Sequence, residues 1–394
     1  MRPVILAPFG PPALACIRSW GEQGWEPGFI CIQSSFSSAP SSRYLVDWVR
    51  LPREDLFKES GIEVIVKFLT SFHADGICCI NEDVSIWLNE NKNKFPDNVS
   101  CWTVESDILL EISSKKKQIE VAKSVGFSVL PTYYLGAGVR DDIPEENFPL
   151  CLRPTLPESI KPDFKVRVVY SDDEINKMLS SAEYIKSPIV AQPFMDLPNI
   201  VVHGSRDIHG SVLFLQAFIV DRKFEGFALT VSPVDIDKKL KENCAKFADF
   251  YKIIGVFHFD IMYDHINNEF YFLELNPRFG GTTAKVYRCG YDEPAMMLCA
   301  YGKDINIDRK IEKYTVGSHF ALIKYLLYCF LNKRNIVDYP RSEKNIDRIL
   351  FVLKRFFFIK DDIFIFSDIK GSFSLYKENI FVKLRGFLRR FCSF

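Results

Sequence analysis

Short apolar runs alternate with segments of helical character along the first hundred residues. The apolar runs predict strands at 3–9, 28–32 and 76–80. Gly10 and two prolines follow the first run, and helices are predicted at 13–24, 62–72 and 84–91. Strands that alternate with helices in short units are typical of a parallel α/β sheet. We therefore expect residues 1–103 to form an α/β domain of ordinary size.

The pattern becomes more mixed after residue 104. Two helices are predicted from Glu105 onward, and the second runs from Ser114 to Val125, with Ser113 or Ser114 as its cap and Gly126 at its end. Strands follow at 150–153, 165–170, 189–194, 200–203 and 212–220, then a helix at 238–254 and helices near Thr282 and Glu293. Residues 314–394 are Phe-rich and show no clear periodicity before their end. We expect an α+β region at 104–305 and an extension at 306–394.

Two more strands, 256–263 and 270–275, are joined by a turn-like segment and carry polar residues. Asp260 lies on the first strand, and Glu274 and Asn276 lie two residues apart at the end of the second. A period of two puts Glu274, Asn276 and Arg278 on one side, and antiparallel pairing would place Asp260 beside Glu274. Two carboxylates and an amide oxygen are hard ligands that suit Mg²⁺. The hairpin therefore predicts a metal–phosphate site.

Arg278 and the two glycines after it extend this candidate site. The guanidinium of Arg278 is a planar fork for phosphate or carboxylate oxygens. Gly280 and Gly281 precede a predicted helix, whose free N–H groups would attract an anion. The alternative is an ordinary polar strand end, but four such residues in line favour a site, because buried charges need partners.

Composition narrows the class of protein. The formal net charge of the 394 residues is zero, so bulk charge predicts no nucleic-acid partner. The 11 cysteines are scattered without a CxxC pair, which argues against a disulfide framework and a zinc knuckle. Prolines interrupt the N-terminal apolar stretch, and the apolar run at 320–331 is too short to span a bilayer. We expect a cytoplasmic protein, and a homodimer stays open.

At this point the motifs resemble those of a known superfamily. GVFHFDIMYD followed by FYFLELNPRFGGT resembles the metal-binding hairpin of the ATP-grasp ligases, an acid on one strand and Glu-x-Asn-x-Arg on the next. SSKKKQIEVAKSVGFSVLPT resembles their lysine-led helix, FPLCLRP their strand ending in Arg-Pro, and IVAQPFM the strand leading into the adenine hinge. The ordered likeness covers roughly residues 1–305. The SSRYL and NPRFGG segments look most like carboxylate–amine ligases of the D-aspartate ligase and carbamoyl-phosphate synthase type.

The resemblance implies a fold, cofactors and residue roles. The expected fold is ATP-grasp: an α/β domain at 1–103, then two α+β subdomains that clasp ATP, the smaller at about 125–195. Asp260, Glu274 and Asn276 would hold Mg²⁺ or Mn²⁺, and Lys115, Arg153, Gln192 and Lys165 would contact ATP. Arg278 would stabilise the acyl phosphate, and His258, two residues before Asp260, would contact substrate or simply pack on its strand.

The implied activity is ligation of a carboxylate to an amine through an acyl phosphate, with release of ADP and phosphate. The substrate would be an amino acid or a sugar acid. The loop at 155–165 departs from the family, since it holds no glycine to approach phosphate closely. Either Ser159, Lys161 and Lys165 supply side-chain contacts instead, or these residues form an ordinary polar loop. Ser114 replaces the usual acid before Lys115, and Pro193 disturbs the hinge, where Asp196 is a poor substitute for an acidic contact.

These departures leave a second function open, a nucleotide-binding protein without catalysis. Biotin-type carboxylation finds no support, because no biotin-accepting Met-Lys pair is visible. The extension is basic, with 12 Lys or Arg against 6 Asp or Glu in residues 341–394. Its last stretch, IFVKLRGFLRRF, is either a basic amphipathic helix on an anionic membrane or a terminal helix packed on its own domain.

Overall fold

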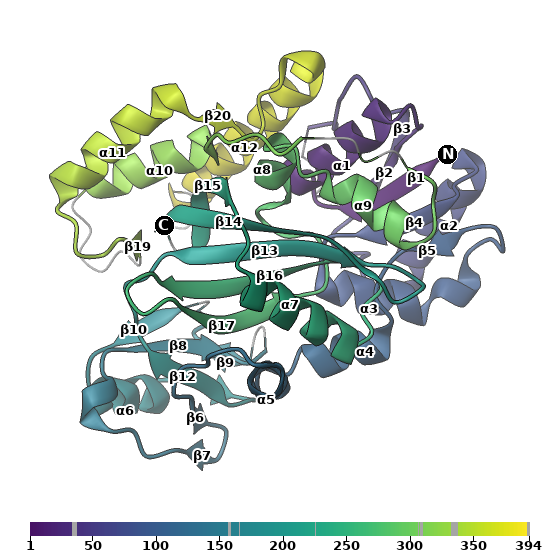
Figure 1. The fold of residues 1–394 in the computed structure, drawn as a ribbon. Helices are drawn as coiled ribbons and strands as arrows, with labels where there is room; N and C mark the ends of the chain where they lie inside the picture. Colours follow the sequence, from purple (N-terminus) through teal and green to yellow (C-terminus); the bar gives the residue numbers. More distant parts are fainter. Residues whose placement is uncertain are drawn as a thin grey trace.

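The computed structural model describes residues 1–33, 38–156, 159–164, 166–224, 226–305, 307, 310–331 and 338–391, with side chains up to residue 380. The described residues form three larger sheets and one two-stranded sheet, and Figure 1 shows helices of the extension beside the largest of them. None of the helices in the described part combines the length and apolar character that crossing a membrane requires.

The first sheet is parallel throughout, as the alternating pattern predicted. Its strands lie in the order β3-β2-β1-β4-β5. Their bounds are β1 (Pro3–Ala7), β2 (Gly28–Gln33), β3 (Asp47–Pro52), β4 (Gly76–Cys79) and β5 (Ser100–Cys101), and the helices are α1 (Pro11–Glu22), α2 (Glu59–Phe72) and α3 (Glu82–Glu90). β1 and β2 are buried along their whole length, because helices cover both faces. The pattern missed β3, an edge strand with exposed residues.

The second sheet is small and antiparallel, in the order β10-β8-β12-β6-β7. It consists of β6 (Tyr133–Gly136), β7 (Val139–Arg140), β8 (Leu150–Pro154), β10 (Arg167–Val169) and β12 (Ile189–Pro193). Helix α6 (Asp172–Ser180) packs Ile175 and Met178 against its buried face. Figure 1 shows this sheet below β17 of the third sheet. Helices α4 (Ser106–Ile112) and α5 (Lys115–Val125) precede it, and Gly126 ends α5 in the left-handed conformation, as predicted.

The third sheet is the largest, in the order β17-β16-β13-β14-β15-β18-β20. Its strands are β13 (Asn199–Arg206), β14 (Val212–Phe224), β15 (Phe227–Val234), β16 (Gly255–Asp264), β17 (Glu269–Asn276), β18 (Val316–Gly317) and β20 (Lys360–Asp361). Alternate residues are buried on opposite faces: Val202 packs with α7 (Lys238–Phe250), and Val201 packs with α8 (Thr283–Arg288) and α9 (Glu293–Ala300). The helix predicted to reach residue 254 ends at Phe250.

The described residues of the extension, for which no clear periodicity was found before its end, form three α-helices. They are α10 (His319–Phe330), α11 (Asn345–Phe358) and α12 (Ile369–Phe391), joined by short elements that include β19 (Asp338–Tyr339) and η3 (Phe366–Asp368). Leu322 and Tyr325 of α10 and Val352 of α11 pack on Phe224 and Leu229 of the third sheet. Strands β18 and β20 also extend that sheet, so the extension is part of the folded body.

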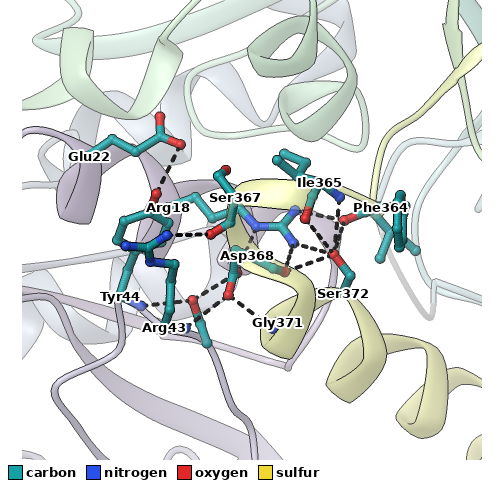
Figure 2. A network of polar contacts seen from close by, with 12 residues as sticks. Arg18, Glu22, Arg43, Tyr44, Phe364, Ile365, Ser367, Asp368, Gly371 and Ser372 are labelled. Carbon is teal, nitrogen blue, oxygen red and sulfur yellow. Dashed lines mark hydrogen bonds and ion pairs between the residues drawn. The ribbon is translucent and has the colours of Figure 1, made fainter.

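A buried arginine ties the N-terminal domain to the extension (Figure 2). Arg18 of α1, only 2% exposed, donates to a carboxylate oxygen of Asp368 at 2.9 Å, to the carbonyl of Ile363 at 2.8 Å and to the hydroxyl of Ser372 at 2.9 Å. Asp368 also accepts the backbone N–H of Arg43 at 2.9 Å. The SSRYL segment is therefore anchored to the extension by a closed network of polar contacts.

Candidate active site

The hairpin of β16 and β17 has the predicted register with one irregularity. Asp260 pairs with Glu274, and the partner of Ile261 is Phe272, so Leu273 is the extra residue of a bulge. Because of this bulge, Phe272 and Leu275 both enter the hydrophobic core although they lie three residues apart. Strict alternation would have put Phe272 and Glu274 on one face. The bulge leaves Glu274 and Asn276 on the face opposite that core, together with Asp260.

The two carboxylates and the amide form a cluster with long contacts. The Asn276 side-chain nitrogen lies 3.4 Å from an oxygen of Asp260 and 3.3 Å from an oxygen of Glu274. Burial and the neighbouring Glu274 raise the pKa of Asp260 above its usual range. Burial would also raise the pKa of Glu274, but Lys115 and Arg153 outweigh it and hold that pKa low. Glu274 is thus kept ionised, while burial and the neighbouring carboxylate favour the protonated form of Asp260.

Lys115 reaches this cluster from the first turn of α5. Its ammonium lies 3.7 Å from an oxygen of Glu274, and burial lowers its pKa. Gln118, one turn further along, fixes the approach, because its side chain accepts the N–H of Leu275 at 2.7 Å and donates to the Leu275 carbonyl at 3.3 Å. Ser114 caps the helix, as predicted. The helix is therefore bonded directly to the strand that carries Glu274.

Arg153 faces the same cluster from the second sheet. It lies on β8, and its guanidinium donates to the side-chain oxygen of Gln192 on β12 at 2.7 Å. Gln192, 3% exposed, donates in turn to the hydroxyl of Thr132 at 2.9 Å. The structure thus places Gln192 behind Arg153 as a support. Lys165, the remaining predicted nucleotide contact, lies outside the described residues.

Arg278 and His258 lie at the turn that follows β17. Arg278 donates to the side-chain oxygen of Asn276 at 3.1 Å and to the carbonyl of Phe279 at 3.0 Å. Nδ1 of His258 lies 3.2 Å from the Arg278 carbonyl, so this nitrogen carries the proton and donates. Burial lowers the pKa of His258 and keeps the ring neutral. A Cβ at Gly280 would lie 2.5 Å from His258 Cε1, so only glycine fits over this ring.

Gly280 and Gly281 precede helix α8, as the sequence predicted, and the expectation that its free N–H groups attract an anion stays a prediction. The N–H of Gly280 donates to the hydroxyl of Thr283 at 2.9 Å, and α8 has six residues, too few for a strong dipole. The N–H of Gly280 therefore stabilises the turn itself and is not available to an anion. A Cβ at Gly281, by contrast, would meet no atom within 4 Å, so the backbone there borders open space.

A buried hydrogen-bond network lies beneath this turn, and the sequence did not predict it. His203, fully buried, lies 2.8 Å from a carboxylate oxygen of Glu293 and 3.0 Å from the hydroxyl of Thr282. The other oxygen of Glu293 accepts the hydroxyl of Thr283 at 2.5 Å. The His203 ring also stacks on His258, with centroids 5.4 Å apart. Nothing in the spacing of His203 and Glu293 signals this contact, because they meet only through the packing of β13 on α9.

Lys223 is a second residue that the sequence did not single out. It lies on β14 and donates to the side-chain oxygen of Asn199 at 2.7 Å. Burial lowers its pKa to about 8, opposed mainly by the charge of Asp260. Its ammonium also lies over the ring of Tyr339, 5.3 Å from the centroid. A buried lysine that faces the carboxylate cluster is a candidate site residue.

The segment between β12 and β13, the predicted adenine hinge, is occupied by contacts from the extension. Asp196 accepts the backbone N–H of Arg341 at 2.9 Å and that of Ser342 at 3.3 Å. The Arg341 guanidinium lies over the rings of Tyr170 and Phe194, 5.3 and 5.1 Å from their centroids. The carboxylate of Asp196 is therefore used in holding the extension.

The glycine-free loop is built differently from a phosphate-binding loop. Ser159 is buried and donates to the carbonyl of Leu156 at 2.7 Å, and Lys161 pairs with Glu183 at 2.9 Å. Lys161 lies in a two-stranded sheet of β9 (Ile160–Lys161) and β11 (Tyr184–Ile185), and Ser159 directly precedes it. Both side chains contact their own subdomain, which agrees with an ordinary polar loop at these two positions.

One cavity of about 300 Å³ lies elsewhere, where α1, α8 and the extension meet. Glu22, Arg288, Lys310 and Glu312 line it, together with aromatic and small residues. Its charges include both signs and compensate one another. None of the predicted site residues borders it, and we place the candidate site at the hairpin, where the perturbed carboxylates and cations converge.

Solved structures show which fold this is. Biotin carboxylase from Campylobacter jejuni, solved with β,γ-ATP, superimposes with a TM-score of 0.62 over 79% of this chain and 74% of its own, at 19% identity. N5-carboxyaminoimidazole synthetase from Staphylococcus aureus, solved with ADP, gives 0.61 over 90% and 96%, at 12% identity. L-amino acid ligase from Bacillus licheniformis gives 0.58 over 80% and 78%, at 15% identity.

The chain has the ATP-grasp fold. No family model and no curated protein sequence matches it, so the likeness rests on structure. Within the ATP-grasp fold the predicted residues come from two sides. Arg153 and Gln192 belong to the small sheet, and Asp260, Glu274 and Asn276 belong to the large one. The fold therefore brings together residues that are more than a hundred positions apart.

Proposed function

We propose that this protein is an ATP-dependent ligase that joins a carboxylate to an amine through an acyl phosphate and releases ADP and phosphate. One observation carries the proposal: Lys115 and Arg153, from two separate elements, meet the Asp260–Glu274–Asn276 cluster, and Arg278 adjoins it. A carboxylate and a triphosphate repel each other, so a site that joins them needs converging cations. Structural neighbours that include an L-amino acid ligase and a biotin carboxylase support this reaction class.

The residues of the cluster fit a divalent cation. Among the described residues, no three His, Cys, Asp or Glu side chains gather into a group that could hold a metal. The donors here are instead two carboxylates and an amide, the hard oxygen set that Mg²⁺ or Mn²⁺ accepts. Burial and the neighbouring carboxylate of Glu274 raise the pKa of Asp260, and a bound divalent cation would offset that repulsion. When bound, the metal would neutralise phosphate oxygens and favour transfer of the γ-phosphoryl group.

Each protein group then has a role that follows from its position. Lys115 and Arg153 would bind phosphate oxygens, with Gln192 orienting the guanidinium of Arg153. Arg278, supported by Asn276, would bind the acyl phosphate or the developing oxyanion. His258, fixed under Gly280, would position Arg278 through its carbonyl. No side chain need act as a nucleophile, because the substrate carboxylate attacks the phosphoryl group and the amine then attacks the acyl carbon.

The finer features of the proposal concern substrates and domains. The carboxylate would be an amino acid or a sugar acid, recognised beside Arg278 and the open backbone at Gly281. The domain division we propose is 1–103, 104–305 and 306–394, with residues 125–195 as the smaller ATP-grasp subdomain. Glu82, at the start of α3 in the first domain, has a pKa raised by burial and faces the charges of Arg278 and Lys115.

ADP release with a panel of carboxylates and amines tests the proposal. The wild type should release ADP only when both partners of a productive pair are present. Glu274→Gln should lower the rate by about 10²–10³-fold, as for loss of one preorganised electrostatic group. The matched control is Glu242→Gln, an exposed glutamate on α7, which should leave the rate unchanged. Equal rates for the wild type and Glu274→Gln would show that the site is wrongly placed.

The loop at 155–164 favours a second candidate, a nucleotide-binding protein without turnover. Ser159 and Lys161 contact their own subdomain, so neither is free for phosphate. Calorimetry with Mg-ATP separates the two candidates. Binding that Glu274→Gln abolishes, without ADP release for any pair in the panel, would favour the second function over the first.

A further inference from the structure

The helices of the extension expose apolar residues on the sides that face away from the core. On α10 these are Ile323, Leu327 and Phe330, which are 43%, 56% and 64% exposed. On α11 they are Ile346, Leu350, Leu353 and Phe357, which are 57%, 55%, 48% and 79% exposed. Both sets recur at three- and four-residue steps, so each forms a stripe along its helix. The two helices lie side by side (Figure 1).

Helix α12 repeats the arrangement. Ser372 and Leu375 face inward and are fully buried, while Ile369, Phe373 and Ile380 are 47%, 63% and 50% exposed. The helix lies against α10, since the rings of Phe320 and Tyr376 stack with centroids 5.8 Å apart. Exposed apolar side chains thus lie on all three helices, and gathered apolar surface of this kind is typical of an interaction site.

Most acidic side chains at 341–394 are buried or paired with other groups of the protein. Asp362 pairs with buried Lys285 at 2.9 Å, Asp368 with Arg18 at 2.9 Å, and Glu343 with Arg222 at 2.6 Å. Asp361 bonds His319, and Glu378 accepts the hydroxyl of Ser38 at 2.7 Å. Of the six acidic residues at 341–394, this leaves Asp347 as the exposed one.

Basic side chains of the same elements are turned outward. Lys344 and Lys354 on or beside α11, and Lys370 and Lys377 on α12, are all exposed. Lys370 and Lys377 alternate with Ile369 and Phe373 on the outer side of α12. The internal pairs thus remove most of the negative charge of residues 341–394 from the surface, and the exposed apolar side chains and lysines are accompanied there by one acid, Asp347.

We propose that the outer face of α10, α11 and α12 is a docking surface for an anionic lipid bilayer. Apolar side chains would enter the boundary between headgroups and acyl chains, and the lysines would attract anionic headgroups. A second copy of this chain fits the face less well, because a symmetric interface would bring its lysines against one another. The helices would lie on the membrane without crossing it, in keeping with their length and composition within the described residues.

Vesicle co-sedimentation of the full chain tests the proposal. We expect binding to vesicles of phosphatidylcholine with phosphatidylglycerol, about tenfold or more weaker binding to phosphatidylcholine alone, and weakening by salt. Leu353→Ser/Phe357→Ser should reduce binding about tenfold or more by removing inserted apolar groups. Lys354→Glu/Lys370→Glu/Lys377→Glu should abolish the preference for anionic vesicles. The control Phe250→Ser/Ile266→Ser changes residues that are 56% and 80% exposed elsewhere and should bind like the wild type.

Three results would overturn the proposal. They are absence of binding to anionic vesicles, equal binding to neutral and anionic vesicles, and equal loss of binding in the Phe250→Ser/Ile266→Ser control. Sedimentation equilibrium covers the protein alternative: a concentration-dependent dimer that Leu353→Ser/Phe357→Ser dissolves would assign the face to a second copy. Melting curves confirm that each variant folds, which we expect because the changed side chains are exposed.

Discussion

Two clusters of charged side chains in this molecule are built in opposite ways. Around Arg18, the guanidinium and the carboxylate of Asp368 have short hydrogen bonds to each other, to carbonyls and to hydroxyls (Figure 2). Around Asp260, the contacts are 3.3–3.7 Å long, and two carboxylates share one side of a hairpin. The pKa of Asp368 is held low although burial opposes this, whereas that of Asp260 is raised.

The difference separates a structural cluster from a candidate site. A closed network leaves no polar atom available to a ligand, and it stabilises the junction of two distant parts of the chain. An open cluster with unbalanced charge is costly until something binds, which is the signature expected of a nucleotide and metal site. We expect mutations around Arg18 to lower stability more than activity, and mutations around Asp260 to lower activity more than stability.

The largest expected effect on stability is at Arg18. Arg18→Met should lower the free energy of unfolding by about 3–5 kcal/mol, because it leaves Asp368 buried without its partner. Urea unfolding followed by tryptophan fluorescence measures it, with Arg53→Met, at an exposed arginine, as the control. A loss below about 1 kcal/mol would mean that the Arg18 cluster is no more structural than a surface ion pair.

At the Asp260–Glu274–Asn276 cluster we expect a large effect on activity and little loss of stability. Asp260→Asn should lower the ligase rate by about 10²–10³-fold, since it removes a metal ligand and a charge. Its urea midpoint should stay the same or rise, because the substitution also removes the repulsion from Glu274. The test is to measure the ligase rate and the urea unfolding midpoint on the same preparation of Asp260→Asn and of the wild type. A large fall in the midpoint with little loss of rate would make the cluster structural.

The glycine turn beside the site is packed as tightly as the Arg18 cluster. Gly280→Ala should cost about 1–3 kcal/mol of stability, because the new Cβ would overlap the His258 ring. His258→Ala should restore part of this loss in the double variant, as a double-mutant cycle would measure. Gly281→Ala, where a Cβ meets open space, is the control. Equal costs at the two glycines would show that His258 does not constrain the turn.

The smallest expected effect concerns the pair of His319, which is partly exposed, and Asp361, which is buried. The hydrogen bond to Asp361 raises the pKa of His319 above its usual value of 6.5. A raised folded-state pKa contributes stability below about pH 6.5 and loses it as pH rises through the folded value. The stability difference between wild type and His319→Gln should therefore shrink from pH 6 to pH 9. A difference that grows over this range in urea titrations would contradict the pairing.

Much of the site was predictable because it is local. Asp260 and Glu274 lie on neighbouring strands of one hairpin, and Lys115 begins a helix with visible caps. His203, Glu293 and Lys223 were not predictable, because they reach the site only through the packing of distant elements. The helices of the extension were missed for a related reason: α10 and α11 are apolar on both their buried and their exposed sides, which blurs the helical period.

By itself, the sequence determined the parallel first sheet, the hairpin that carries Asp260, Glu274 and Asn276, and the cap at Gly126. These features follow from the hydrophobic period and the residue types of short segments, because local backbone geometry links both to secondary structure. The tertiary structure alone decided that a bulge at Leu273 keeps Glu274 on the outer face of the hairpin. It also decided that the N–H of Gly280 bonds to Thr283. Most acids at 341–394 are buried or paired, whereas Lys354, Lys370 and Lys377 are exposed, and this too depends on the tertiary structure. Each of these depends on which distant groups satisfy a buried charge or donor, and spacing along the chain does not encode that.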